Sequence, residues 1–258
     1  GERGALLRDG RERLPQGRGR HGVAGRGGHG GALFDHVRGE GSPAGDGHEA
    51  DAERIGLWGT SYAGGHAIVL GATDRRLRAV VSQMPTISGH EQGLRRVAPD
   101  VVAALEETFS EDERARFRGE APRTQTVVSS DPAVPASYRS QDAIDFCLQP
   151  VPDGVWENTV TVRSTRAARR YEPGTWITRV SPTPLLRVAA VNGTVTLTDM
   201  ALAAYERALE PKRLRVMPSG HFDPYTSEFD QASAAARAWF REHLMRGRPA
   251  ADRAAGTS

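Results

Sequence analysis

A serine within a glycine-rich turn is the most chemically informative residue of this sequence. Ser61 lies in the segment GLWGTSYAGG at residues 56–65, with Gly59 two residues before it and Ala63 two residues after it. A Gly-x-Ser-x-small turn between a strand and a helix lifts the serine hydroxyl above the end of the strand, and larger flanking side chains would collide across the turn. A hydroxyl presented in this way can attack a carbonyl carbon. The segment therefore predicts a nucleophile.

A histidine in the last quarter of the sequence is the matching candidate for a general base. His221 lies in MPSGHFDPY at residues 217–225, after a short run that predicts a strand. From the loop after a strand, an imidazole can take the serine proton and return it to a leaving group. The other histidines have no comparable position, and none shows metal-ligand spacing with a third ligand. We therefore expect no metal. We also expect no cofactor, because acyl transfer through a serine needs only water and side chains of the protein.

Alternating strands and helices must position these two side chains. The pattern becomes regular at residue 51 and predicts strands at Arg54–Trp58, Leu77–Gln83, Leu185–Val191 and Leu214–Met217, and helices at Gly64–Ala72, Met200–Leu209 and Glu228–Leu244. This alternation predicts an α/β fold with a mostly parallel sheet flanked by helices. The core would comprise residues 51–90 and 180–246.

One polar insertion, at residues 91–179, interrupts this alternation and predicts a helical cap over the catalytic face. Its expected helices are Val101–Phe109, Glu111–Arg118, Ser140–Leu148 and Val160–Tyr171, with Ser110 as the N-cap between the first two. The larger aromatic residues of the cap could line a pocket or form its small core: Phe146, Trp156 and Trp176.

The two motifs, in the order serine then histidine, resemble the α/β-hydrolase superfamily over residues 51–246. The Ser-Tyr pair is similar to the branch that holds X-Pro dipeptidyl-peptidase-like, dienelactone-hydrolase-like and polyketide-processing hydrolases. The resemblance implies a serine hydrolase that cleaves a carboxylic ester or thioester through an acyl-enzyme on Ser61, with His221 as general base. It also implies an oxyanion hole formed by the Tyr62 amide and by a second donor near Val23.

The acid of the expected triad is where the sequence departs from this family. Gly193 occupies the position of the carboxylate, and Leu197 stands where a proline would follow. Asp199 is the nearest candidate acid, although it also suits a helix N-cap. In well-studied triads, loss of the acid function lowers turnover by about 10⁴-fold. A degenerate hydrolase with little or no turnover therefore remains an alternative to an active esterase.

The first fifty residues differ from the rest of the chain. They hold 15 of its 29 glycines and eight arginines, a composition that cannot bury enough apolar surface to offset ordering entropy. We predict that residues 1–50 are poorly ordered or degenerate, that the N-terminal strands are incomplete, and that residues 247–258 are a disordered tail. An Arg/Gly-rich segment could bind nucleic acid, but no aromatic residue precedes Phe34, and we expect no nucleic-acid partner.

The composition of the chain limits its size class, its cellular location and its possible partners. The 258 residues fit one domain with a cap, and the formal net charge is only +2. Cys147 is the one cysteine, which favours a cytoplasmic location. No apolar stretch approaches the roughly 18 residues of a membrane span. We therefore expect a small-molecule ester or acyl substrate and no membrane partner, with the oligomeric state left open.

Overall fold

Four parallel strands form the central sheet of the protein. The computed structural model describes residues 51–245. Within them the strands lie in the order β1 (Ile55–Thr60), β2 (Leu77–Gln83), β6 (Leu185–Asn192) and β7 (Lys212–Gly220), and every neighbouring pair is parallel. Because parallel strands share a direction, the loops at their carboxyl ends meet at one edge of the sheet.

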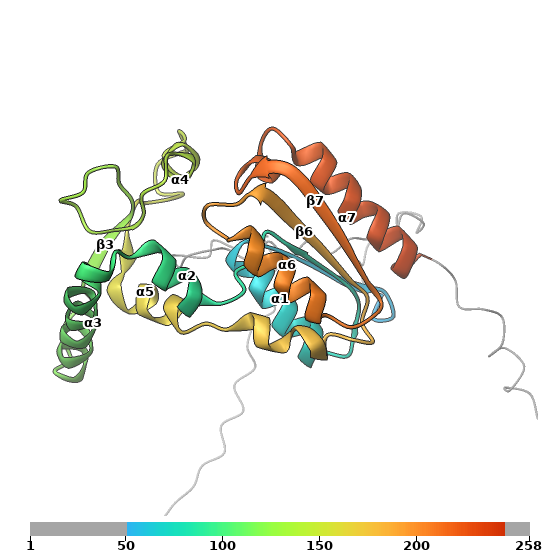
Figure 1. The fold of residues 1–258 in the computed structure, drawn as a ribbon, viewed down its shortest axis with the longest axis horizontal. Helices are drawn as coiled ribbons and strands as arrows, with labels where there is room; N and C mark the ends of the chain where they lie inside the picture. Colours follow the sequence, from blue (N-terminus) through green and yellow to red (C-terminus); the bar gives the residue numbers. More distant parts are fainter. Residues whose placement is uncertain (1–50, 246–258) are drawn as a thin grey trace, which may run out of the picture.

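Helices cover both faces of this sheet (Figure 1). On one face α1 (Tyr62–Thr73), the 3₁₀ helix η2 (Pro173–Arg179) and α6 (Thr198–Arg207) pack around Ile68 and Val80, which are fully buried. On the other face α7 (Phe229–Leu244) buries Phe240. Burying one such large side chain contributes about 1.5–3 kcal/mol. The sheet and its helices confirm the predicted α/β fold.

The insertion between β2 and β6 lies to one side of the sheet in Figure 1. It contains α2 (Gly89–Arg96), η1 (Pro99–Val101), α3 (Val102–Phe117), α4 (Gln141–Cys147) and α5 (Val162–Arg169). It also contains a small sheet in the order β4 (Ala136–Tyr138), β3 (Thr124–Val128) and β5 (Val160–Thr161). The sequence had predicted a purely helical cap, and this prediction is wrong because the insertion also contains strands. These strands have only two to five residues each and pair across long loops, which leaves little periodicity in the sequence.

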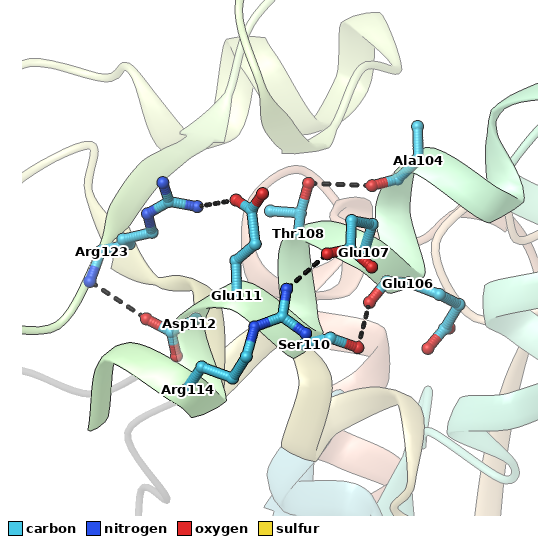
Figure 2. A network of polar contacts seen from close by, with 9 residues as sticks. All are labelled: Ala104, Glu106, Glu107, Thr108, Ser110, Glu111, Asp112, Arg114 and Arg123. Atoms are coloured by element: carbon cyan, nitrogen blue, oxygen red, sulfur yellow. Dashed lines mark hydrogen bonds and ion pairs between the residues drawn. The ribbon is translucent and has the colours of Figure 1, made fainter. Parts of the chain in front are cut away.

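The expectation that two helices meet at Ser110 is wrong. A single helix, α3, runs through this position. The Ser110 hydroxyl donates a hydrogen bond of 2.9 Å to the carbonyl of Glu106 one turn earlier, and Thr108 bonds Ala104 in the same way (Figure 2). A serine hydroxyl can thus be satisfied inside a helix by back-bonding, instead of capping a new one.

The remaining differences concern the ends of elements. The last strand, β7, extends beyond the predicted Leu214–Met217 at both ends. Helix α6 begins at Thr198 with Leu197 as its N-cap, so Asp199 lies in the first turn and not at the cap. The expectations for residues 1–50 and 247–258 lie outside the described residues. Within residues 51–245, no helix is long and apolar enough to span a membrane.

Candidate active site

Ser61 lies at the tight turn between β1 and α1. Its backbone has φ 53° and ψ −119°, in a region that costs a residue with a side chain appreciable strain. The turn is held on both sides, since the Ser61 amide donates to the carbonyl of Gln83 at 2.9 Å and the Ser61 carbonyl accepts from Thr86 at 3.0 Å. A Cβ added to Gly59 would lie 2.1 Å from the carbonyl oxygen of Ala63. These are the features that the prediction of a nucleophile elbow requires.

His221 follows β7 directly and faces this serine. Its side chain is buried, and its Nε2 lies 3.0 Å from the Oγ of Ser61. The rings of Phe222 and Tyr225 meet the imidazole edge-on, with centroid distances of 4.8 and 5.8 Å. The imidazole is thus fixed at hydrogen-bond distance from the hydroxyl, as general-base catalysis requires.

The surroundings keep His221 neutral. Burial lowers the pKa of His221 to about 3, the charge of Arg96 adds to this effect, and the charge of Asp142 opposes it. A neutral imidazole can accept the serine proton, whereas an imidazolium cannot. The same burial makes the protonated intermediate costly, so a negative charge near the other nitrogen would matter for catalysis.

A threonine occupies the acid side of His221. Thr196, in the loop between β6 and α6, places its Oγ1 3.0 Å from the His221 Nδ1. The expected acid position, Gly193, has no room for a side chain, because an added Cβ would lie 2.2 Å from the carbonyl oxygen of Thr196. Sequence reasoning missed Thr196, although it lies only three residues after the position where the acid was sought.

Asp199 is placed away from the histidine. Its carboxylate accepts a hydrogen bond of 2.7 Å from Nη1 of Arg95, and both side chains are exposed. The two residues line an open hollow formed by α2, η2 and α6, and neither Ser61 nor His221 is among the lining residues of that hollow. The structure therefore brings Ser61 and His221 together but does not bring Asp199 to them.

Tyr62, the expected oxyanion donor, is the first residue of α1. The N–H groups in the first turn of a helix have no acceptor within the helix, which leaves the Tyr62 amide available beside the nucleophile. The Tyr62 ring packs on Tyr171 and His66, at centroid distances of 4.9 and 5.1 Å. The second expected donor, near Val23, lies outside the described residues.

Of the three aromatic residues singled out in the cap, one is close to His221. Phe146 on α4 stacks on Phe222, the residue after His221, at 4.6 Å. Trp176 packs against the core cluster around Ile68 and Val80, and Trp156 is exposed. Around this site, the described part of the chain holds no group of three His, Cys, Asp or Glu side chains that could bind a metal ion.

Sequence comparison finds distant relatives of this chain. No family model matches the chain. The chain is 27% identical over 180 residues to the quorum-quenching protein AidA of Acinetobacter baumannii, covering 69% of this chain and 58% of AidA. It is 24% identical over 185 residues to the polyketide transferase claH of Penicillium crustosum (69% and 59%) and 26% identical over 191 residues to the thiohydrolase apmlB of Arthrinium phaeospermum (69% and 60%). The chain thus spans less than two thirds of the length of these relatives.

Solved structures define the class of fold. The α/β hydrolase GrgF from Penicillium sp. sh18 aligns with a TM-score of 0.62 at 22% identity, over 76% of this chain and 65% of GrgF. A monoacylglycerol lipase from Paleococcus ferrophilus aligns with a TM-score of 0.51 at 15% identity, over 74% of this chain and 69% of the lipase. The protein has the α/β-hydrolase fold. Its membership of the α/β-hydrolase superfamily stays a prediction. The narrower peptidase-like and dienelactone-hydrolase-like branch stays a prediction.

Proposed function

We propose that this protein is a serine hydrolase that cleaves a carboxylic ester or thioester through an acyl-enzyme on Ser61. One observation carries the proposal: a strained serine at a strand–helix turn lies 3.0 Å from the Nε2 of a buried histidine. The Ser61 oxygen would form a bond to the carbonyl carbon while its proton passes to His221. The Tyr62 amide would then face the developing oxyanion.

The relatives support an acyl substrate. The relatives described above include a thiohydrolase and a polyketide transferase, and these names are consistent with an acyl substrate for this chain. An ester suits this site better than an amide, because amide cleavage makes greater demands on a triad whose acid position holds glycine. The single cysteine of the chain is the basis for proposing that this chemistry takes place in the cytoplasm.

A degenerate hydrolase with little turnover is the second candidate, and the acid side of the site favours it. A neutral hydroxyl, that of Thr196, contacts the His221 Nδ1 where a triad would have a carboxylate. Such a protein would retain the elbow and the serine–histidine contact but would deacylate slowly, because nothing directly bonded to the imidazolium would offset its charge.

The test compares the wild type with Ser61→Ala on a short-chain p-nitrophenyl ester and on an acyl thioester. We expect the substitution to lower the rate by about 10³-fold or more, to the uncatalysed background. Covalent labelling by a fluorophosphonate probe separates the two candidates. Labelling of Ser61 without turnover supports the degenerate hydrolase, whereas equal hydrolysis and no labelling in either protein would refute both.

A further inference from the structure

The catalytic histidine needs two things from its acid side, and Thr196 can provide only one of them. To accept a proton at Nε2, the neutral His221 must carry its own proton on Nδ1, and the Thr196 Oγ1 at 3.0 Å can accept that N–H. A hydroxyl therefore holds the tautomer and the ring orientation. It has no negative charge, so it does not stabilise the imidazolium that forms when Ser61 attacks.

Two charged side chains of the cap act on the charge of His221, with opposite effects. Asp142, at the start of α4, favours the protonated imidazole, and Arg96, at the end of α2, disfavours it. The other groups around the ring are Ser61, Thr196, the Phe222 ring and the phenol of Tyr225, whose pKa is raised by burial. Asp142 thus supplies the negative charge that opposes burial and Arg96 at His221.

Packing and hydrogen bonds fix Asp142 in this place. Its Oδ2 accepts a hydrogen bond of 2.8 Å from Thr194, which lies in the same loop as Thr196. The next residue, Ala143, is buried in a cluster that includes Val195 and is packed by Phe222. One turn later, Phe146 stacks on Phe222. Helix α4 therefore contacts both the β6–α6 loop and the segment that follows β7, which holds His221 and Phe222.

Asp142 is also held in its charged form. Partial burial alone would raise its pKa, but hydrogen bonds from Ser140, Thr194 and the Ala143 amide, together with the charge of His221, hold the pKa of Asp142 below its usual value. The carboxylate is consequently ionised at neutral pH.

We propose that the acid function of this site is divided between two positioning residues, Thr196, which fixes the tautomer of His221, and Asp142 of the cap, whose charge stabilises the imidazolium. The inference rests on the proposed function and extends it. The proton of Ser61 moves to Nε2 as the bond to the carbonyl carbon forms, and it then moves to the ester oxygen or thioester sulfur as that bond breaks. Asp142 takes no proton at any step.

The first experiment removes the charge and keeps the shape. Asp142→Asn retains an oxygen for the Thr194 hydroxyl, and we expect it to lower kcat/KM for the p-nitrophenyl ester by about 10-fold. Asp145→Asn is the matched control, because Asp145 lies on the same helix, where Gln141 bonds its carboxylate, and the net charge changes equally. The control should keep wild-type kcat/KM. Equal rates in both variants and the wild type would overturn the proposal.

A double-mutant cycle tests the division of labour. Thr196→Asp places a carboxylate at the Nδ1, and we expect it to raise kcat/KM and to make Asp142→Asn nearly neutral in that background. Additive effects of the two substitutions would overturn the proposal. If circular dichroism shows that Thr196→Asp is unfolded, Arg96→Gln is used in its place. Arg96→Gln should raise the apparent pKa that the pH profile of kcat/KM shows on its acid side, whereas Asp142→Asn should lower this pKa.

A spectroscopic titration separates this inference from the proposed function. The imidazole shifts of His221 are followed by NMR across pH in protein labelled with carbon-13 at histidine Cε1. We expect a lower pKa for His221 in Asp142→Asn, a higher one in Arg96→Gln and no change in Asp145→Asn. If no ester is hydrolysed but the pKa of His221 changes as expected, the proposed function fails and the charge coupling stands. An unchanged pKa of His221 in Asp142→Asn overturns the coupling whatever the activity.

Discussion

The two loops that contact His221 are built alike but offer different chemistry. On the serine side, a Cβ at Gly59 would lie 2.1 Å from the carbonyl of Ala63, and on the acid side a Cβ at Gly193 would lie 2.2 Å from the carbonyl of Thr196. Each turn is closed by a backbone approach that only glycine permits. The first glycine positions Ser61, whereas the second stands where the sequence analysis expected a carboxylate.

The hydrogen bonds of the two sides have the same length and different consequences. Both the Nε2–Ser61 and the Nδ1–Thr196 distances are 3.0 Å. Across the first, a proton can move to the histidine and on to a leaving group. Across the second, a neutral hydroxyl can only orient the ring. A parallel sheet thus brings the loops together at one edge, but the residues in each loop determine the chemistry that is possible there.

The largest effect is expected from adding a methyl group at Gly59, within the turn that holds Ser61. Gly59→Ala should destabilise the protein by about 2–3 kcal/mol and abolish ester hydrolysis, because the Ala63 carbonyl belongs to α1 and α1 is packed on the sheet. Gly193→Ala should cost less, since its loop is partly exposed and can shift. Urea unfolding of both variants measures the difference. Equal losses would mean that the acid-side loop is as constrained as the elbow.

A smaller effect is expected from acidification, because His221 resists protonation in the folded state. Its pKa of about 3 lies below the value of about 6.5 for an unfolded chain, so between these values only the unfolded state binds the proton. Stability is fully present above pH 6.5 and falls as the pH is lowered. This one group should remove about 2 kcal/mol from the free energy of unfolding between pH 7 and pH 5.

The control for this pH dependence is His221→Gln. The difference in unfolding free energy between pH 7 and pH 5 should be smaller in the variant by the contribution of His221, while other histidines contribute equally to both proteins. An identical pH dependence would show that His221 titrates normally. It would also mean that the acid side provides more negative charge than a threonine and one cap carboxylate.

The smallest effect is expected at Asp199, the candidate acid suggested by the sequence. Its partner is Arg95 in an exposed ion pair, and such pairs contribute about 0–1 kcal/mol. Asp199→Asn should therefore change kcat/KM for the ester by less than about 2-fold. A loss approaching the roughly 10⁴-fold of a missing triad acid would show that the loop rearranges to bring Asp199 to His221.

The sequence by itself determined the parts of this protein that depend on short segments. The run from Ile55 to Ala72 specifies a strand, a tight turn and a helix, since small residues stand where the backbone approaches closely. The position of His221 after the last apolar run and the absence of a carboxylate at Gly193 were equally readable. These features follow from local sterics and from the order of motifs along the chain.

Only the tertiary structure decided what surrounds the imidazole. Thr196 reaches Nδ1 because the β6–α6 loop folds back over Gly193. Asp142 bonds Thr194 of the same loop, and α4 packs on Val195 and Phe222. Ser110 continues a helix because its hydroxyl finds a carbonyl within that helix. No short segment encodes such contacts. They depend on the packing of residues that are distant in the chain, and that packing fixes where the Asp142 carboxylate lies relative to His221.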